Sequence, residues 1–101
     1  WAFGTDILYC GGASQGRQLA KLARFMTPLE ALHRATGAAG ALLALSGARA
    51  PYDGRLGVIE AGALADLLVI DGDTETSLDW LSDTDTLRLI MKGGQLFKNT
   101  L

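Results

Sequence analysis

Asp6 is the residue near the start of the chain whose type and position best suit chemistry. It follows Gly4 and Thr5, which end the apolar run that opens the sequence. We predict that residues 2–5 are the end of a buried strand, and parallel α/β barrels carry their catalytic groups just past such strand ends. Taken by itself, an aspartate in this context more commonly caps a turn. Asp6 is therefore either a catalytic carboxylate or a turn residue.

Ser14 suggests a second kind of chemistry, nucleophilic attack by a hydroxyl group. Residues 12–16 match the G-x-S-x-G motif of serine hydrolases, which also needs an acid and then a histidine further along the chain. His33 is the single histidine of the sequence, it falls inside an expected helix, and only Glu30 precedes it as an acid. We favour a flexible loop for residues 11–16, with a serine hydrolase that uses Ser14 as the weaker alternative.

The metal-ligating residue types are too few for a complete metal site in this chain. Catalytic zinc takes about three protein ligands, whereas His33 and Cys10 are each the single residue of their type. Cys10 is expected to be a small core residue. A group of acidic residues lacks the register of a calcium loop and is expected to lie in solvated turns. Its members are Asp71, Asp73, Glu75, Asp79, Asp83 and Asp85.

The composition allows one domain and excludes some partners. Hydrophobic residues make up 49% of the 101 positions, and there are 13 glycines in addition. The share of hydrophobic residues and glycine together is above the roughly 45–50% typical of soluble domains. This excess predicts apolar faces that further chain, a partner or a second copy covers. The net charge of −2 argues against nucleic acid. No apolar run is as long as the roughly 18 residues needed to span a bilayer. We expect a cytoplasmic protein.

The elements that must position these residues form a helical half and a β half. Helical spacing covers residues 17–26, and Thr27, Pro28 and Glu30 form the start signal of a second helix with a capping box. Its body covers residues 29–45, and Gly37 and Gly40 predict that another element packs closely against it.

After residue 47 the spacing of the hydrophobic residues is no longer helical. Residues 54–62 and 65–73 are predicted to be short strands bounded by glycine and aspartate, and residues 77–82 one helical turn. Gly93-Gly94 joins two apolar runs as the type I′ turn of a hairpin. Asp66 is expected to cap the turn that enters its own strand, and Trp80 to be a satellite core residue.

Three blocks of the sequence resemble the C-terminal part of the metal-dependent amidohydrolase superfamily. They are AFGTD at 2–6, PLEALHRATGAAGALLAL at 28–45 and GRLGVIEAGALADLLVIDGD at 54–73. The tail IMKGGQLFKN at 90–99 resembles the closing hairpin of the imidazolonepropionase and Xaa-Pro dipeptidase branch. Gly37-Ala38 and Asp73-Thr74 depart from the family pattern, but neither pair belongs to the residues that would carry out the reaction.

The resemblance implies a C-terminal fragment of a (β/α)8 barrel followed by strands of a small β-sandwich. Residues 1–50 would hold the last barrel strand and two helices, and residues 51–101 the sandwich strands of this composite α/β protein. Asp6 would be both a metal ligand, usually to zinc, and the catalytic residue. It would take a proton from the metal-activated water and deliver it to the leaving nitrogen of an amide or peptide-like substrate.

The same resemblance implies that the other metal ligands lie outside this chain. The family takes them from a His-x-His pair, further histidines and often a carboxylated lysine, none of which the sequence supplies. We therefore expect the isolated chain to be inactive and to bind no metal alone. Its expected partners are the N-terminal portion of the same enzyme, a small-molecule substrate in the complete enzyme, or further copies of itself. A non-catalytic, self-associating module is the alternative function.

Overall fold

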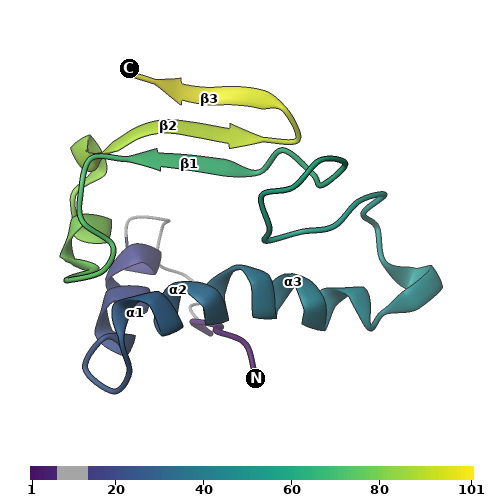
Figure 1. Ribbon diagram of the computed structural model, residues 1–101, viewed down its shortest axis with the longest axis horizontal. Helices are drawn as coiled ribbons and strands as arrows, with labels where there is room; N and C mark the ends of the chain where they lie inside the picture. The colour runs from purple at the N-terminus through teal and green to yellow at the C-terminus, as the bar shows by residue number, and fades with distance from the viewer. Residues whose placement is uncertain (7–13) are drawn as a thin grey trace.

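The computed structural model describes residues 1–6 and 14–101, in which a helical layer precedes a small antiparallel sheet (Figure 1). The helices are α1 (Gln15–Leu22), α2 (Pro28–Ala35) and α3 (Gly37–Ala44), and the strands are β1 (Leu67–Ile70), β2 (Leu87–Lys92) and β3 (Gln95–Asn99). Short 3₁₀ turns are η2 (Gly47–Arg49), η3 (Asp79–Ser82) and η4 (Thr84–Thr86). This mixture is consistent with the predicted α/β class, while the barrel and the division at residue 50 stay predictions.

The start of α2 confirms the capping box. The Thr27 hydroxyl accepts a hydrogen bond from the Glu30 backbone N–H at 3.3 Å, and the Glu30 carboxylate accepts one from the Thr27 N–H at 3.2 Å. Pro28 occupies the first helical position, where its missing N–H costs nothing. These local contacts fix the start of α2.

The single helix predicted over residues 29–45 is wrong in one respect, because Thr36 interrupts it. Thr36 has φ −118° and ψ −91°, outside the helical region, and its hydroxyl donates to the Leu32 carbonyl oxygen at 2.8 Å. Such back-bonding by threonine bends helices. The helix predicted over residues 17–26 also ends early, at Leu22, and Phe25 N–H donates to the Leu22 carbonyl in the turn that follows.

The predicted close approach at α3 is confirmed. Gly40 is buried, and a Cβ atom there would collide with the carbonyl oxygen of Leu56. Gly57 has φ +74°, and a Cβ there would collide with the carbonyl oxygen of Thr36. The backbone of residues 56–57 therefore packs directly on the junction between α2 and α3, where only glycine fits.

The strand predicted over residues 54–62 is wrong, because this segment folds as a loop. Gly57 and Gly62 have positive φ angles of 74° and 87°, which break an extended conformation. The Leu64 N–H donates to the Arg55 carbonyl at 2.9 Å, and the Arg55 guanidinium pairs with Glu60 at 2.7 Å. The segment thus closes on itself instead of pairing with a strand.

The sheet has the order β1-β2-β3, and the predicted hairpin joins β2 to β3. Gly93 and Gly94 have φ angles of 56° and 79°, as a type I′ turn requires. The 3₁₀ turn η3 confirms the helical turn predicted at 77–82, and the predicted strand at 65–73 is present but shorter.

Asp66 is structural, as predicted, but it caps a different turn. Its carboxylate accepts a hydrogen bond from the Gly93 N–H at 2.7 Å, so it caps the turn between β2 and β3. The neighbouring Ala65 carbonyl accepts from the Gly94 N–H at 3.0 Å. The start of β1 and the hairpin turn are thus fixed together.

Candidate functional site

The segment before Asp6 is held against two helices. The Phe3 N–H donates to the Arg34 carbonyl at 3.1 Å, and the Arg34 guanidinium lies 4.8 Å from the centre of the Trp1 ring. The Thr5 hydroxyl donates to the Gln15 side-chain oxygen at 2.6 Å, at the start of α1. Residues 2–5 are not a strand, which corrects the prediction. Their backbone pairs with the end of α2 instead of with a neighbouring strand among the described residues.

Asp6 follows this anchored segment in an uncommon backbone conformation. Its φ angle is +53°, which is rare for residues other than glycine, although aspartate tolerates it better than most. Such residues are concentrated at functional sites. The side chain is exposed, and no hydrogen bond or ion pair joins its carboxylate to another described residue. The carboxylate is therefore accessible at a position that the helices fix through residues 3 and 5.

The described residues do not by themselves fit a metal ion. Residues 1–6 and 14–101 contain no group of three or more His, Cys, Asp or Glu side chains that could hold one. Asp6 is an exposed single carboxylate, and Cys10 lies outside the described residues. A metal at Asp6 would need ligands that these residues do not supply.

The positions of Ser14 and His33 in the structure give the serine-hydrolase alternative no support. Ser14 is the N-cap of α1, and His33 is exposed on α2, with its ring beside Gly37. The preceding motif residues, Gly12 and Ala13, lie outside the described residues. His33 thus lies on the exposed side of its helix.

Two of the acidic residues near the sheet confirm the prediction of solvated turns. The Asp73 carboxylate accepts hydrogen bonds from the Glu75 N–H at 2.9 Å and the Thr76 hydroxyl at 3.1 Å. Asp83 accepts from the Asp85 N–H at 2.9 Å. These carboxylates cap their own turns, as aspartates in turns commonly do.

The hydrogen bonds at Asp73 lower the pKa of its carboxyl group, the Glu75 N–H first and the Thr76 hydroxyl second. Because the folded-state pKa is depressed, the turn contributes stability above the ordinary aspartate pKa and loses it as pH falls through the lowered pKa. We expect Thr76→Val to raise the pKa of Asp73, measured by carboxyl NMR titration. An unchanged pKa in this variant would contradict the assigned cause.

Trp80 is partly buried in a small satellite cluster, as predicted. Its indole N–H donates to the Ser77 carbonyl at 3.0 Å, and the neighbouring Leu78 is 1% exposed. The Thr86 hydroxyl donates to the Trp80 carbonyl at 2.7 Å. This cluster links η3 to the start of β2.

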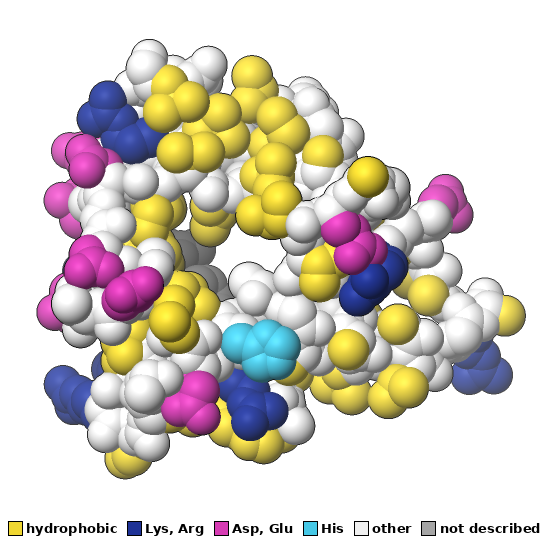
Figure 2. All heavy atoms as spheres, in the orientation of Figure 1, with side chains coloured by type: hydrophobic (Ala, Val, Ile, Leu, Met, Phe, Trp, Pro, Cys, Tyr) yellow, Lys and Arg dark blue, Asp and Glu magenta, His cyan; other side chains and the backbone are white. Residues whose placement is uncertain are grey.

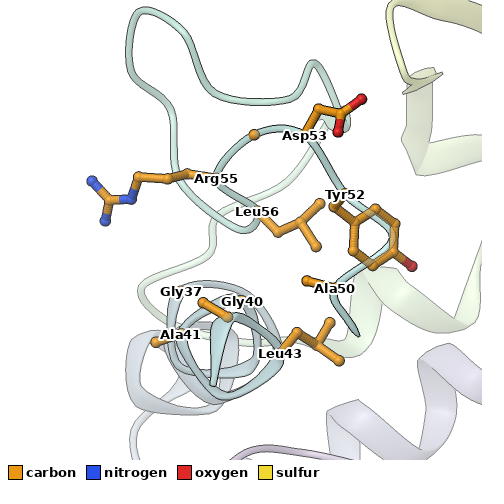
Figure 3. A pocket seen from close by; sticks show the side chains of 11 residues that line it. Gly37, Gly40, Ala41, Leu43, Ala50, Tyr52, Asp53, Arg55 and Leu56 are labelled. Atoms are coloured by element: carbon orange, nitrogen blue, oxygen red, sulfur yellow. The ribbon is translucent and has the colours of Figure 1, made fainter. Parts of the chain in front are cut away.

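A hollow of about 390 Å³ that the sequence did not predict lies between α3 and residues 50–56 (Figure 3). Leu43, Ala50, Tyr52 and Leu56 line it with apolar surface. Figure 3 shows the Arg55 side chain directed away from it. Asp53 and Arg55 are the charged residues of its lining, but among the described residues no group of polar side chains converges on the hollow, as an active site requires.

The comparisons with known proteins give one similar solved structure. No protein-family model and no curated protein matches the chain. A crystal structure of an amidohydrolase is 35% identical to this chain with a TM-score of 0.76, over 99% of this chain and 23% of the amidohydrolase. The similarity supports a relation to the amidohydrolase family, and hence to hydrolases. It does not distinguish a branch within that family.

Within the described residues, no helix is both long enough and apolar enough to cross a bilayer.

Proposed function

We propose that this chain is the C-terminal part of a metal-dependent amidohydrolase that hydrolyses a C–N bond of a small-molecule substrate. The observation that supports the proposal is the 35% identity to a solved amidohydrolase over 99% of the chain, at a TM-score of 0.76. The chain spans 23% of that amidohydrolase, so the complete site needs further polypeptide. In this proposal that polypeptide is the N-terminal portion of the same enzyme.

Asp6 is the residue that we propose for the chemistry. An accessible carboxylate can accept a proton from the attacking water and then deliver it to the leaving nitrogen, which would otherwise depart as a poor amide anion. The anchors at Phe3 and Thr5 support this role, because they fix the backbone before Asp6 against α2 and α1. Because this backbone is already held in place, less entropy is lost when the Asp6 side chain reaches the reacting geometry.

The finer parts of the proposal come from the sequence. The hairpin tail at residues 90–99 resembles that of the imidazolonepropionase and Xaa-Pro dipeptidase branch. The resemblance of the blocks to the amidohydrolase family implies zinc as the usual metal. Asp6 would supply one oxygen donor, and the remaining donors would come from the rest of the enzyme. A cytoplasmic location stays a prediction.

A chimera tests the proposal. The 101 residues would replace the matching 23% of the solved amidohydrolase, and hydrolysis of that enzyme's own substrate would be measured. We expect a folded, active chimera, and no turnover by the isolated chain with or without zinc. A folded chimera without activity would contradict the proposed function, and zinc-dependent hydrolysis by the isolated chain would contradict its dependence on further polypeptide.

A further inference from the structure

The hydrogen bond between Thr5 and Gln15 joins two residues that lie 10 positions apart. The Thr5 hydroxyl donates to the Gln15 side-chain oxygen at 2.6 Å, at the short end of the range for O–H···O bonds. Thr5 is half-buried and directly precedes Asp6, while Gln15 is the first residue of α1. The side chain of Gln15 therefore connects the residue before Asp6 to a helix.

The start of α1 is packed closely enough to serve as an anchor. Gly16, the residue after Gln15, lies so near η3 that a Cβ atom there would collide with the carbonyl oxygen of Leu81. The helix also contacts α2, whose end bonds to the Phe3 N–H. Because α1 is packed against both elements, a bond to the Gln15 side chain holds Thr5 at a fixed place.

The Asp6 carboxylate has no direct contact that orients it among the described residues. On the face seen in Figure 2, the Lys and Arg side chains are scattered and form no single cluster. In the described part of the chain the ion pair is the one between Arg55 and Glu60, and no hydrogen bond reaches the Asp6 carboxylate. The direction of this side chain is thus set by the backbone of Asp6.

The backbone of Asp6 needs support from its neighbours. A φ angle of +53° is costly for a residue with a side chain, and it persists only where the surrounding structure determines it. Within residues 1–6, the bond from Thr5 to Gln15 is the contact nearest to Asp6, and the bond from the Phe3 N–H comes next. The Phe3 bond uses only the main-chain carbonyl of Arg34, which any residue there could supply. Gln15 is therefore the side chain on which the conformation of Asp6 depends most.

We propose that Gln15 is a positioning residue, which holds Asp6 in its reactive direction through the hydroxyl of Thr5. The inference rests on the proposed function, in which Asp6 moves the proton between water and the leaving nitrogen. A displacement of about 1 Å at a reacting group can cost about a hundredfold in rate. Since Gln15 acts through Thr5 and not on the substrate, its loss lowers kcat and leaves KM nearly unchanged.

NMR of the 101-residue chain tests the positioning without any need for activity. The Cα and Cβ chemical shifts of Asp6 report its positive φ angle, and we expect Gln15→Leu, which offers no acceptor to Thr5, to move them toward extended values. Gln18→Leu is the matched control, because Gln18 lies on the same helix and accepts from Lys21 instead. This control should leave the Asp6 shifts unchanged. Unchanged shifts in Gln15→Leu would overturn the proposal.

Kinetics of the active chimera test the path through Thr5. We expect Gln15→Leu to lower kcat about tenfold while KM changes less than about twofold, and Gln18→Leu to change neither by more than about twofold. Thr5→Val removes the hydroxyl and should cost as much as Gln15→Leu, whereas Thr5→Ser keeps the hydroxyl and should retain most of kcat. The double variant Thr5→Val with Gln15→Leu should lose no more than either single variant, since the two residues share one bond.

The outcomes separate this inference from the proposed function. If Asp6→Asn lowers kcat but Gln15→Leu behaves like Gln18→Leu, Asp6 is catalytic and the role of Gln15 is wrong. If the losses of Thr5→Val and Gln15→Leu add in the double variant, the two residues act independently, which also overturns the inference. If Asp6→Asn is harmless, the proposed function fails, and the catalytic role of Gln15 fails with it.

Discussion

Asp6→Asn is expected to lower kcat of the active chimera by about 10²–10⁴-fold, the contribution of a positioned general acid–base. Asparagine keeps the size of the side chain but cannot accept the proton of water at neutral pH. The anchors at Phe3 and Thr5 remain, because neither uses the Asp6 carboxylate. Steady-state kinetics would measure kcat and KM separately, and circular dichroism would confirm an unchanged fold.

Asp53→Asn is the matched control for this experiment. Asp53 is also an exposed carboxylate, and it lies beside the apolar hollow of α3, away from the segment that carries Asp6. We expect its kcat to stay within about twofold of the parent, as surface substitutions usually have small effects. If Asp6→Asn were as harmless as this control, Asp6 would be a turn residue.

Gly40→Ala is expected to destabilise the chain by about 1–3 kcal/mol, the usual cost of forcing an added methyl group into a packed site. The new Cβ would meet the carbonyl oxygen of Leu56, which is backbone and cannot rotate away. The loop at residues 56–57 would have to move off the helices. Denaturant unfolding at one fixed protein concentration would measure the free energy of unfolding.

Gly37→Ala, one turn earlier in the same helix, is the control. Its Cβ would lie 3.1 Å from the His33 ring, an exposed side chain that can rotate away. Alanine also favours the helix by up to about 1 kcal/mol. We expect Gly37→Ala to be neutral or stabilising, and a cost equal to that of Gly40→Ala would contradict the assigned packing.

Features decided by neighbours in the sequence were predictable. The capping box needs only Thr27 and Glu30, three positions apart, and the hairpin needs only two glycines between apolar runs. The small residues at Gly37 and Gly40 indicated a close approach, although they did not identify residues 56–57 as the approaching segment.

Features decided by distant contacts were not predictable. Residues 54–62 resemble a short strand bounded by glycines, but a strand needs a partner, and this segment closes through Leu64 and Arg55 instead. Asp66 was assigned to its own turn because its true partner, the Gly93 N–H, lies 27 positions away. The position of the candidate site likewise depends on contacts between residues far apart in the sequence. The sequence predicted Asp6 as a functional carboxylate, but its position depends on contacts with Gln15 and Arg34.

A crystal structure of the active chimera tests the central claim, that Asp6 is the carboxylate of a hydrolytic site completed by other polypeptide. We predict the Asp6 carboxylate at the floor of the substrate cleft, within hydrogen-bonding distance of the attacking water or its mimic in a bound inhibitor. An Asp6 side chain turned away from the cleft and bonded only to its own turn, in a chimera that still hydrolyses substrate, would contradict the claim.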